Sequence, residues 1–185
     1  MSWTTEIAVF SGELSEHSCD WARKPYHLAE ALKRICRTLS VNILSQSIDE
    51  IYPDERDLLS CAHVQECAYV RQIFLEGDGV PLCFARVTVP LITYYHYEDQ
   101  FKNLGENLLG NALLYAQPGT VRGEFEFTIM TEKNPLYIYL KSKLPKDYFL
   151  AETVFARRSL FCMEDKFPLV VTEIFLNQLP AYKEG

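Results

Sequence analysis

The alternation of apolar and polar positions predicts more strands than helices. Residues 68–76 and 80–89 are apolar runs on either side of Gly77-Asp78-Gly79, a strong turn signal, so they predict a β-hairpin. Residues 40–48 and 121–129 alternate as half-buried strands do. Two more strands are expected at 153–163 and 169–176, with Asp165-Lys166 in the turn between them.

Helical periodicity is weaker and confined to short segments. Residues 26–39 carry apolar side chains at 28, 32, 35 and 39, close to a 3.6-residue period, and Pro25 suits a first helical turn. Residues 53–60 predict a turn with at most a short helix. Residues 98–115 predict two short helices broken at Gly105, or a helix-turn-helix flap. Without a βαβ rhythm, the pattern indicates a single α+β domain over 1–185, an antiparallel sheet with helices covering one face or its ends.

Composition narrows the classes of partner. The 185 residues carry a formal net charge of −7, and no basic cluster is longer than the pair Arg157-Arg158, which argues against nucleic acid as a partner. No segment reaches the ~20 apolar residues of a membrane span, and the N-terminus does not resemble a secretory signal. We therefore expect a soluble cytoplasmic protein with no membrane insertion. An anionic ligand would require a locally positive site inside this acidic protein.

Several common chemistries have no motif here. The six cysteines, at 19, 36, 61, 67, 83 and 162, form no CxxC pair, and the four histidines form no HExxH, so we expect reduced thiols and no metal. GxSxG, Walker-type and GxGxxG motifs are absent from the sequence. The aromatic stretch 94–97 is interpreted as packing rather than as a stacking platform for bases.

Two arginines interrupt the apolar hairpin. With the turn centred near residue 78 or 79, Arg71 and Arg86 fall nearly opposite each other, with both side chains on one face. Like charges in this position repel, and burying either without a partner costs several kcal/mol. Three solutions remain open: an internal carboxylate, an anionic ligand bound by both planar guanidinium groups, or side chains that extend to the sheet edge.

A carboxylate also stands alone in an apolar strand. Glu173 in LVVTEIFL either pairs with Arg71 or Arg86, or accepts a hydrogen bond from a ligand hydroxyl. Adjacent strand residues point to opposite faces, so at most one of Arg157 and Arg158 faces inward, and a surface pair is favoured. Two inward cations and one inward carboxylate suit a small hydroxylated cyclic acid.

Four ordered motifs resemble the chorismate lyases, which make 4-hydroxybenzoate for ubiquinone. The first is R-x-I-x-L-x-x-D-G-x-P followed by A-R-x-x-x-P within residues 71–90. The others are LGENLLG at 104–110, ARRS at 156–159 and PLVVTEIFLNQLPAY at 168–182. The resemblance spans about residues 26–182, and residues 1–20 match the family pattern poorly.

The resemblance implies a fold, a reaction and a site. The fold is a single antiparallel sheet whose helical flaps close over an internal cavity, and the reaction converts chorismate to 4-hydroxybenzoate and pyruvate without a cofactor, as the first committed step of ubiquinone synthesis. Arg71 and the backbone N–H of Leu109 would bind the ring carboxylate, and Leu28 would cover the ligand. Glu173 would bind the ring hydroxyl and Arg86 the enolpyruvyl carboxylate, which makes these two the expected catalytic residues. The expected partners are substrate and product alone, with the protein a monomer.

Two alternatives stay open. The ligand-sensing domains of some bacterial transcription regulators share this fold, but such a regulator needs a DNA-binding helix-turn-helix, and only about 25 residues precede the first helix of the domain. The other alternative is an enzyme on the same scaffold that acts on a different cyclic carboxylic acid. A purely structural protein would leave the arginines and Glu173 unexplained.

Overall fold

The computed structural model describes residues 3–10, 12, 16–24, 26–59 and 66–182, with the side chains of 16–19 left aside. Pro25, Cys61 and the side chain of Cys19, all considered above, lie outside this part. The strands are β1 (Leu39–Glu50), β2 (Cys67–Gly77), β3 (Val80–Pro90), β4 (Val121–Arg122), β5 (Glu126–Thr131), β6 (Thr153–Met163) and β7 (Phe167–Phe175). The helices are η1 (Ile7–Phe10), α1 (Glu16–Arg23), α2 (Leu28–Lys33), α3 (Pro53–Leu58), α4 (Leu91–His96), α5 (Glu98–Lys102), the π-helical turn η3 (Gly110–Leu114) and α6 (Pro135–Lys143).

The strands form a seven-stranded antiparallel sheet in the order β1-β2-β3-β7-β6-β4, with β5 also pairing with β6. This confirms the α+β class and the strands expected at 40–48, 68–76, 80–89, 153–163 and 169–176. The single strand expected at 121–129 is wrong, because residues 123–125 separate β4 from β5. Glycine weakens a strand interior, and Gly123 lies at this break, with its N–H donating to the carbonyl of Leu160.

A one-residue bulge near the turn sets the register of the β2–β3 hairpin. Glu76 pairs with Pro81, but Leu75 pairs with Cys83, so Leu82 is the extra residue on β3. Proline lacks the N–H that a regular ladder requires, which places Pro81 naturally beside a bulge.

The bulge overturns the expected arrangement of the two hairpin arginines. A bulge-free hairpin with this turn would pair Arg71 with Arg86. Instead Arg71 lies opposite Val87, and Arg86 lies opposite Gln72. Since directly paired residues share a face and neighbours alternate, the two arginines point to opposite faces of the sheet. The expectation that they face one another is therefore wrong.

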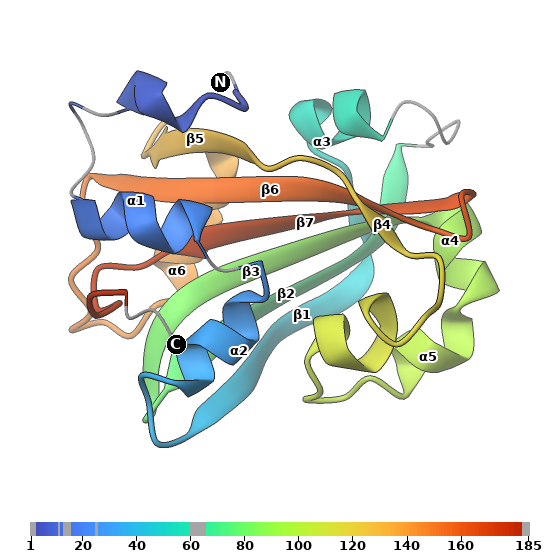
Figure 1. The fold of residues 1–185 in the computed structure, drawn as a ribbon, viewed down its shortest axis with the longest axis horizontal. Helices are drawn as coiled ribbons and strands as arrows, with labels where there is room; N and C mark the ends of the chain where they lie inside the picture. Colours follow the sequence, from blue (N-terminus) through green and yellow to red (C-terminus); the bar gives the residue numbers. More distant parts are fainter. Residues whose placement is uncertain (1–2, 11, 13–15, 25, 60–65, 183–185) are drawn as a thin grey trace.

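Helices cover both faces of the sheet (Figure 1). One face, here called the flap face, carries α1, α2 and the helical segment 91–115. The other, the rear face, carries α3 and α6. The helix expected at 26–39 is shorter than predicted, since α2 ends at Lys33 and β1 begins at Leu39. The α6 helix was not predicted; Asn134 caps it by accepting hydrogen bonds from the N–H groups of Leu136 and Tyr137 at 2.8 and 3.3 Å.

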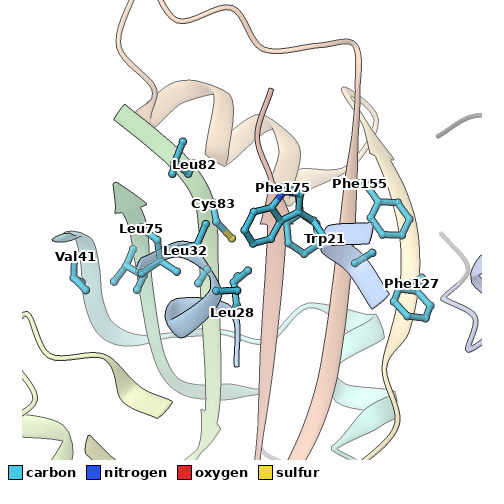
Figure 2. Close-up of a cluster of buried hydrophobic side chains, with 14 residues drawn as sticks. Trp21, Leu28, Leu32, Val41, Leu75, Leu82, Cys83, Phe127, Phe155 and Phe175 are labelled. Atoms are coloured by element: carbon cyan, nitrogen blue, oxygen red, sulfur yellow. The ribbon is translucent and has the colours of Figure 1, made fainter. Parts of the chain in front are cut away.

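The flap-face core joins α1 and α2 to the middle of the sheet. Figure 2 shows Leu28 and Leu32 of α2 beside Leu75 of β2 and Cys83 of β3. Within the described residues, no helix is long and apolar enough to cross a membrane.

A candidate active site between the sheet and its helical cover

A cavity of about 90 Å³ lies on the flap face, between the sheet and the cover formed by α2 and residues 108–115. Most of its wall is apolar. The polar side chains on its wall include Glu173 of β7, Arg122 of β4 and Tyr115 at the end of η3. The apolar wall includes Leu28, Ile73, Ala85, Val87, Leu108, Leu109, Leu114, Phe161 and Val171. Leu28 and Leu109, expected to contact a ligand, thus meet at one cavity with Glu173.

Arg71 is a buried cation without an anionic partner among the described residues. Its side chain is 1% exposed, and Nη2 donates to the carbonyl oxygens of Gly105 at 2.8 Å and Asn107 at 3.4 Å. Nη1 has no hydrogen-bond partner within the described part of the chain. Burial lowers the pKa of Arg71 below its ordinary value, and the nearby Tyr69 hydroxyl offsets part of this. The guanidinium therefore lacks a compensating negative charge.

Sheet geometry places Arg71 beside the cavity rather than in its wall. Arg71 lies two residues before Ile73 on β2, on the same face, and pairs with Val87. Both Ile73 and Val87 line the cavity. Glu173 lies on β7, two strands from β2 and on the same face. It is level with Ile73, because Ile73 pairs with Ala85 and Ala85 pairs with Glu173. Strand and residue spacings put the Cα atoms of Arg71 and Glu173 about 12 Å apart. Two side chains that approach from this separation leave room for one six-membered ring between their polar ends.

Glu173 is paired, but with a different arginine from those considered above. Ala85, Glu173 and Arg157 lie side by side across β3, β7 and β6. Arg157 Nε donates to Glu173 Oε2 at 2.5 Å, and its Nη1 donates to the carbonyl of Ala22 at 3.1 Å. Arg157 is fully buried, whereas the Glu173 side chain is 13% exposed. Arg157 thus holds the Glu173 carboxyl group in place at the cavity wall.

The expectation of a surface pair at Arg157-Arg158 is wrong, because both side chains are buried. They do point to opposite faces, as alternation requires. Arg158 lies on the rear face, where Nε binds Glu126 at 2.6 Å and Nη1 binds Asp54 at 3.2 Å.

Arg86, expected to bind the enolpyruvyl carboxylate, also lies on the rear face, across the sheet from the cavity. It forms a bidentate pair with Glu55 of α3, at 2.8 Å from Nε and 3.0 Å from Nη2. The Nη2 group also donates to the carbonyl of Glu50, and the guanidinium stacks 4.3 Å from the ring centre of Tyr52. Burial alone would lower the pKa of Arg86, but Glu55 raises it above its ordinary value. The expectation that Arg86 binds the ligand is thus corrected, because the carboxylate of Glu55 already neutralises its guanidinium.

Sequence reasoning missed Arg122. In an uninterrupted strand over 121–129, Arg122 would share the solvent side with Glu124 and Glu126. The break at 123–125 inverts this alternation, so Arg122 pairs with Phe161 on the flap face, as Phe127 pairs with Arg157. Gly123, which lies in the break, was the available sequence signal.

Arg122 is packed between aromatic rings at the cavity wall. Its guanidinium carbon lies 3.9 Å from the ring centre of Phe125, 4.9 Å from that of Tyr26 and 5.1 Å from that of Phe161. Nε donates to Ser159 Oγ at 2.9 Å and Nη1 to the carbonyl of Tyr26 at 2.5 Å. Burial lowers the pKa of Arg122, and the charge of Glu173 acts in the opposite direction.

The rear face has a larger open cavity, of about 600 Å³, with the wrong charge for an anionic ligand. Asp54, Glu55 and Asp57 contribute to its wall against a single cation, Lys133. Two of these carboxylates already bind buried arginines. Charge therefore favours the smaller flap-face cavity as the site for an acid.

Comparison with known proteins identifies relatives over nearly the whole chain. The family model described as chorismate lyase matches residues 9–184. A protein of Aromatoleum aromaticum named "Probable chorismate pyruvate-lyase" is 32% identical over 84% of this chain and 82% of its own length. The "Chorismate pyruvate-lyase" of Pectobacterium carotovorum is 25% identical over 91% of this chain and 82% of its own.

Solved structures share the fold at low identity. The ligand-binding domain of a GntR-family transcriptional regulator from Bordetella bronchiseptica superposes with a TM-score of 0.52 and 8% identity, covering 80% of this chain and 88% of its own. The C-terminal domain of the histidine utilization repressor from Pseudomonas syringae also gives 0.52, with 11% identity over 80% and 98% of the two chains. At these identities the likeness shows the fold alone.

Proposed function

This chain belongs to the chorismate lyase family, and we propose that it converts chorismate to 4-hydroxybenzoate and pyruvate without a cofactor. The observation that carries the proposal is Arg71, a buried guanidinium with no carboxylate partner among the described residues, beside a cavity that contains Glu173. A bound carboxylate supplies the missing charge, and arginine binds carboxylates through two parallel hydrogen bonds.

The reaction is an elimination that makes the ring aromatic. The ether bond from the ring to the enolpyruvyl oxygen breaks, and the hydroxyl-bearing ring carbon loses its proton. The electron pair of that C–H bond completes the aromatic ring, and the leaving group becomes pyruvate when its enol is protonated. Aromatisation drives the reaction, so the protein mainly has to orient the dianion and stabilise charge on the leaving group.

The two ends of the ring match the two polar ends of the site. The ring carboxylate and the hydroxyl occupy opposite ring positions, and we assign them to Arg71 and Glu173 respectively. The backbone N–H of Leu109 joins Arg71 at the carboxylate, and this places residues 105–109 directly over the ligand, since Arg71 binds the carbonyls of Gly105 and Asn107. Glu173 orients the hydroxyl. Proton removal by Glu173 and by the substrate itself both fit this arrangement.

The volume of the cavity, about 90 Å³, is well below the ~300–1,000 Å³ typical of sites that bind small molecules. Leu28 and Leu109 form part of its cover, and the side chain of Asn111 donates to Glu30 of α2 at 3.0 Å, which joins the two parts of that cover. We infer that α2 and residues 105–115 separate to admit chorismate and that their reopening governs release of 4-hydroxybenzoate.

We further propose that the protein acts as a cytoplasmic monomer whose product enters ubiquinone synthesis. The family's reaction supplies an aromatic acid of the kind that quinone head groups require, and the acidic net charge of −7 disfavours nucleic acid and anionic membranes.

Incubation of the purified protein with chorismate tests the proposal. Absorbance follows 4-hydroxybenzoate, and a coupled dehydrogenase assay follows pyruvate. We expect equal amounts of both products. Pyruvate no higher than in the protein-free control would overturn the assignment, and tight binding of 4-hydroxybenzoate without turnover would favour a ligand-sensing module.

A further inference from the structure

If the proposed reaction is accepted, the structure leaves one of the two substrate carboxylates without a partner. Arg71 accounts for the carboxylate on the ring. Arg86, the expected partner of the enolpyruvyl carboxylate, is on the rear face and bound to Glu55. Another cation on the flap face must meet this second carboxylate, because a buried carboxylate without a counter-charge costs several kcal/mol.

The position of the enolpyruvyl group on the ring of chorismate indicates where this cation must lie. The enolpyruvyl ether is attached to the ring carbon next to the hydroxyl-bearing carbon. Its carboxylate therefore lies nearer the Glu173 end of the ring than the Arg71 end. The required cation should line the cavity close to Glu173.

Two arginines lie near Glu173 on the flap face, and one of them already forms an ion pair. Arg157 binds Glu173 directly. Arg122 lines the same cavity and is close enough to Glu173 for the two charges to interact. Among the described residues no carboxylate lies within 4 Å of Arg122. Its guanidinium donates to the hydroxyl of Ser159 and the carbonyl of Tyr26, both neutral acceptors.

The charge balance supports the same choice. The site contains three arginines, Arg71, Arg122 and Arg157, and one paired carboxylate, Glu173. Its net charge without a ligand is therefore +2. Glu30, also at the cavity wall, is neutralised by Lys33 at 2.8 Å. Chorismate carries two negative charges, so its binding balances the site.

We propose that Arg122 binds the enolpyruvyl carboxylate of chorismate and stabilises the negative charge that develops on the departing enolpyruvate. The aromatic rings around the guanidinium hold it in one orientation and shield it from water, which strengthens its interaction with an anion. After the elimination 4-hydroxybenzoate retains the carboxylate bound by Arg71, while pyruvate carries away the one bound by Arg122. Arg122 therefore distinguishes substrate from product.

Substitution of Arg122 tests this asymmetry. In Arg122→Gln we expect kcat/KM for chorismate to fall about 100-fold, the loss typical when one partner of a buried charge pair is removed. The Kd for 4-hydroxybenzoate, measured by calorimetry, should stay within about threefold, because the product makes no contact with Arg122 in this arrangement. Arg122→Lys, which keeps the charge, should recover part of the lost turnover.

Arg158→Gln is the matched control, since it removes a buried arginine from the rear face of the adjacent strand β6 and should leave kcat/KM near the wild-type value. Equal losses of turnover and product affinity in Arg122→Gln, or unchanged turnover, would overturn the inference. If Arg122→Gln does not fold, Arg122→Lys carries the same comparison, and equal effects on substrate and product again refute it. Wild-type protein that releases no pyruvate would instead refute the proposed function itself.

Discussion

The two faces of the sheet differ in whether every arginine on them has an internal carboxylate partner. On the rear face, Arg86 binds Glu55 and Arg158 binds Glu126 and Asp54, so each guanidinium has an internal carboxylate. On the flap face, Arg157 binds Glu173, but Arg71, which is buried, and Arg122, which is partly buried, have no carboxylate partner among the described residues. The pKa directions agree, since Glu55 raises the pKa of Arg86 while burial lowers the pKa of Arg71 and of Arg122.

This difference separates structural charge from functional charge. A buried ion pair that is complete within the protein contributes to one folded arrangement and has no remaining capacity for a ligand. A buried cation that lacks its partner costs folding free energy, and the cost is offset only when an anion binds. The residue type alone carries no such distinction: Arg71 and Arg86 come from the same hairpin and are 1% and 2% exposed.

The largest expected effect is on the rear face and concerns stability. Glu55→Gln leaves Arg86 buried without its counter-charge, so the free energy of unfolding should fall by about 3–5 kcal/mol. Urea unfolding monitored by circular dichroism measures this change. The double variant Glu55→Leu with Arg86→Met removes both charges and should regain most of the loss. A full loss in the double variant would show that the pair is not the source.

Arg71→Met should give the reverse pattern. Methionine has a similar length and no charge, so the unfolding free energy of the ligand-free protein should stay equal or rise. Turnover should collapse, with kcat/KM for chorismate at least about 100-fold lower, because the ring carboxylate loses its charge partner. Steady-state pyruvate release and urea unfolding on one protein batch give both numbers. Marked destabilisation with normal turnover would place Arg71 with the structural arginines.

Glu173→Gln should change ligand discrimination more than overall binding. The wild-type protein should prefer 4-hydroxybenzoate over benzoate by about 10-fold or more, the worth of a hydrogen bond to a charged group. In the variant this preference should shrink, since a neutral amide is the weaker acceptor of the phenolic proton. Competitive inhibition by the two acids measures it. An unchanged ratio would exclude Glu173 as the hydroxyl partner.

The smallest expected effect lies in the cover of the cavity. A Cβ atom added at Gly110 would lie 2.8 Å from Cε2 of Tyr115, so Gly110→Ala displaces a ring that lines the cavity. Overpacking of this size costs about 1–3 kcal/mol. Because the Tyr115 side chain can shift, we expect a cost near the lower end of this range. We expect a few-fold weaker binding of 4-hydroxybenzoate by calorimetry. The wild-type affinity in this variant would show that Tyr115 moves freely from the site.

Sequence patterns were sufficient for the sheet and for part of the site. Alternation and the Gly77-Asp78-Gly79 turn predicted the hairpin, and the charges of Arg71 and Glu173 stood out because their strands are otherwise apolar. The same patterns failed where the register breaks. A single extra residue, Leu82, moves Arg86 to the rear face, and the break at 123–125 moves Arg122 to the flap face.

The partners in the buried ion pairs could not be predicted from local sequence patterns, for a different reason. Glu55 precedes Arg86 by 31 residues and reaches it from α3, a helix that packs on the rear face. Arg157 meets Glu173 through the register of β6 and β7. Such pairings depend on which elements cover which face, and periodicity within one element carries no information about that choice.

The affinity for 4-hydroxybenzoate tests the contrast between the two faces most directly. Calorimetric titration compares the wild-type protein, Arg71→Met, and the charge-free double variant Glu55→Leu with Arg86→Met. We predict that Arg71→Met weakens binding by at least about 100-fold. The double variant should bind within about twofold of the wild type, as expected for a distant change across the sheet. Normal binding in Arg71→Met, or a loss of binding in the double variant alone, would contradict the assignment of Arg71 to the carboxylate of the ligand.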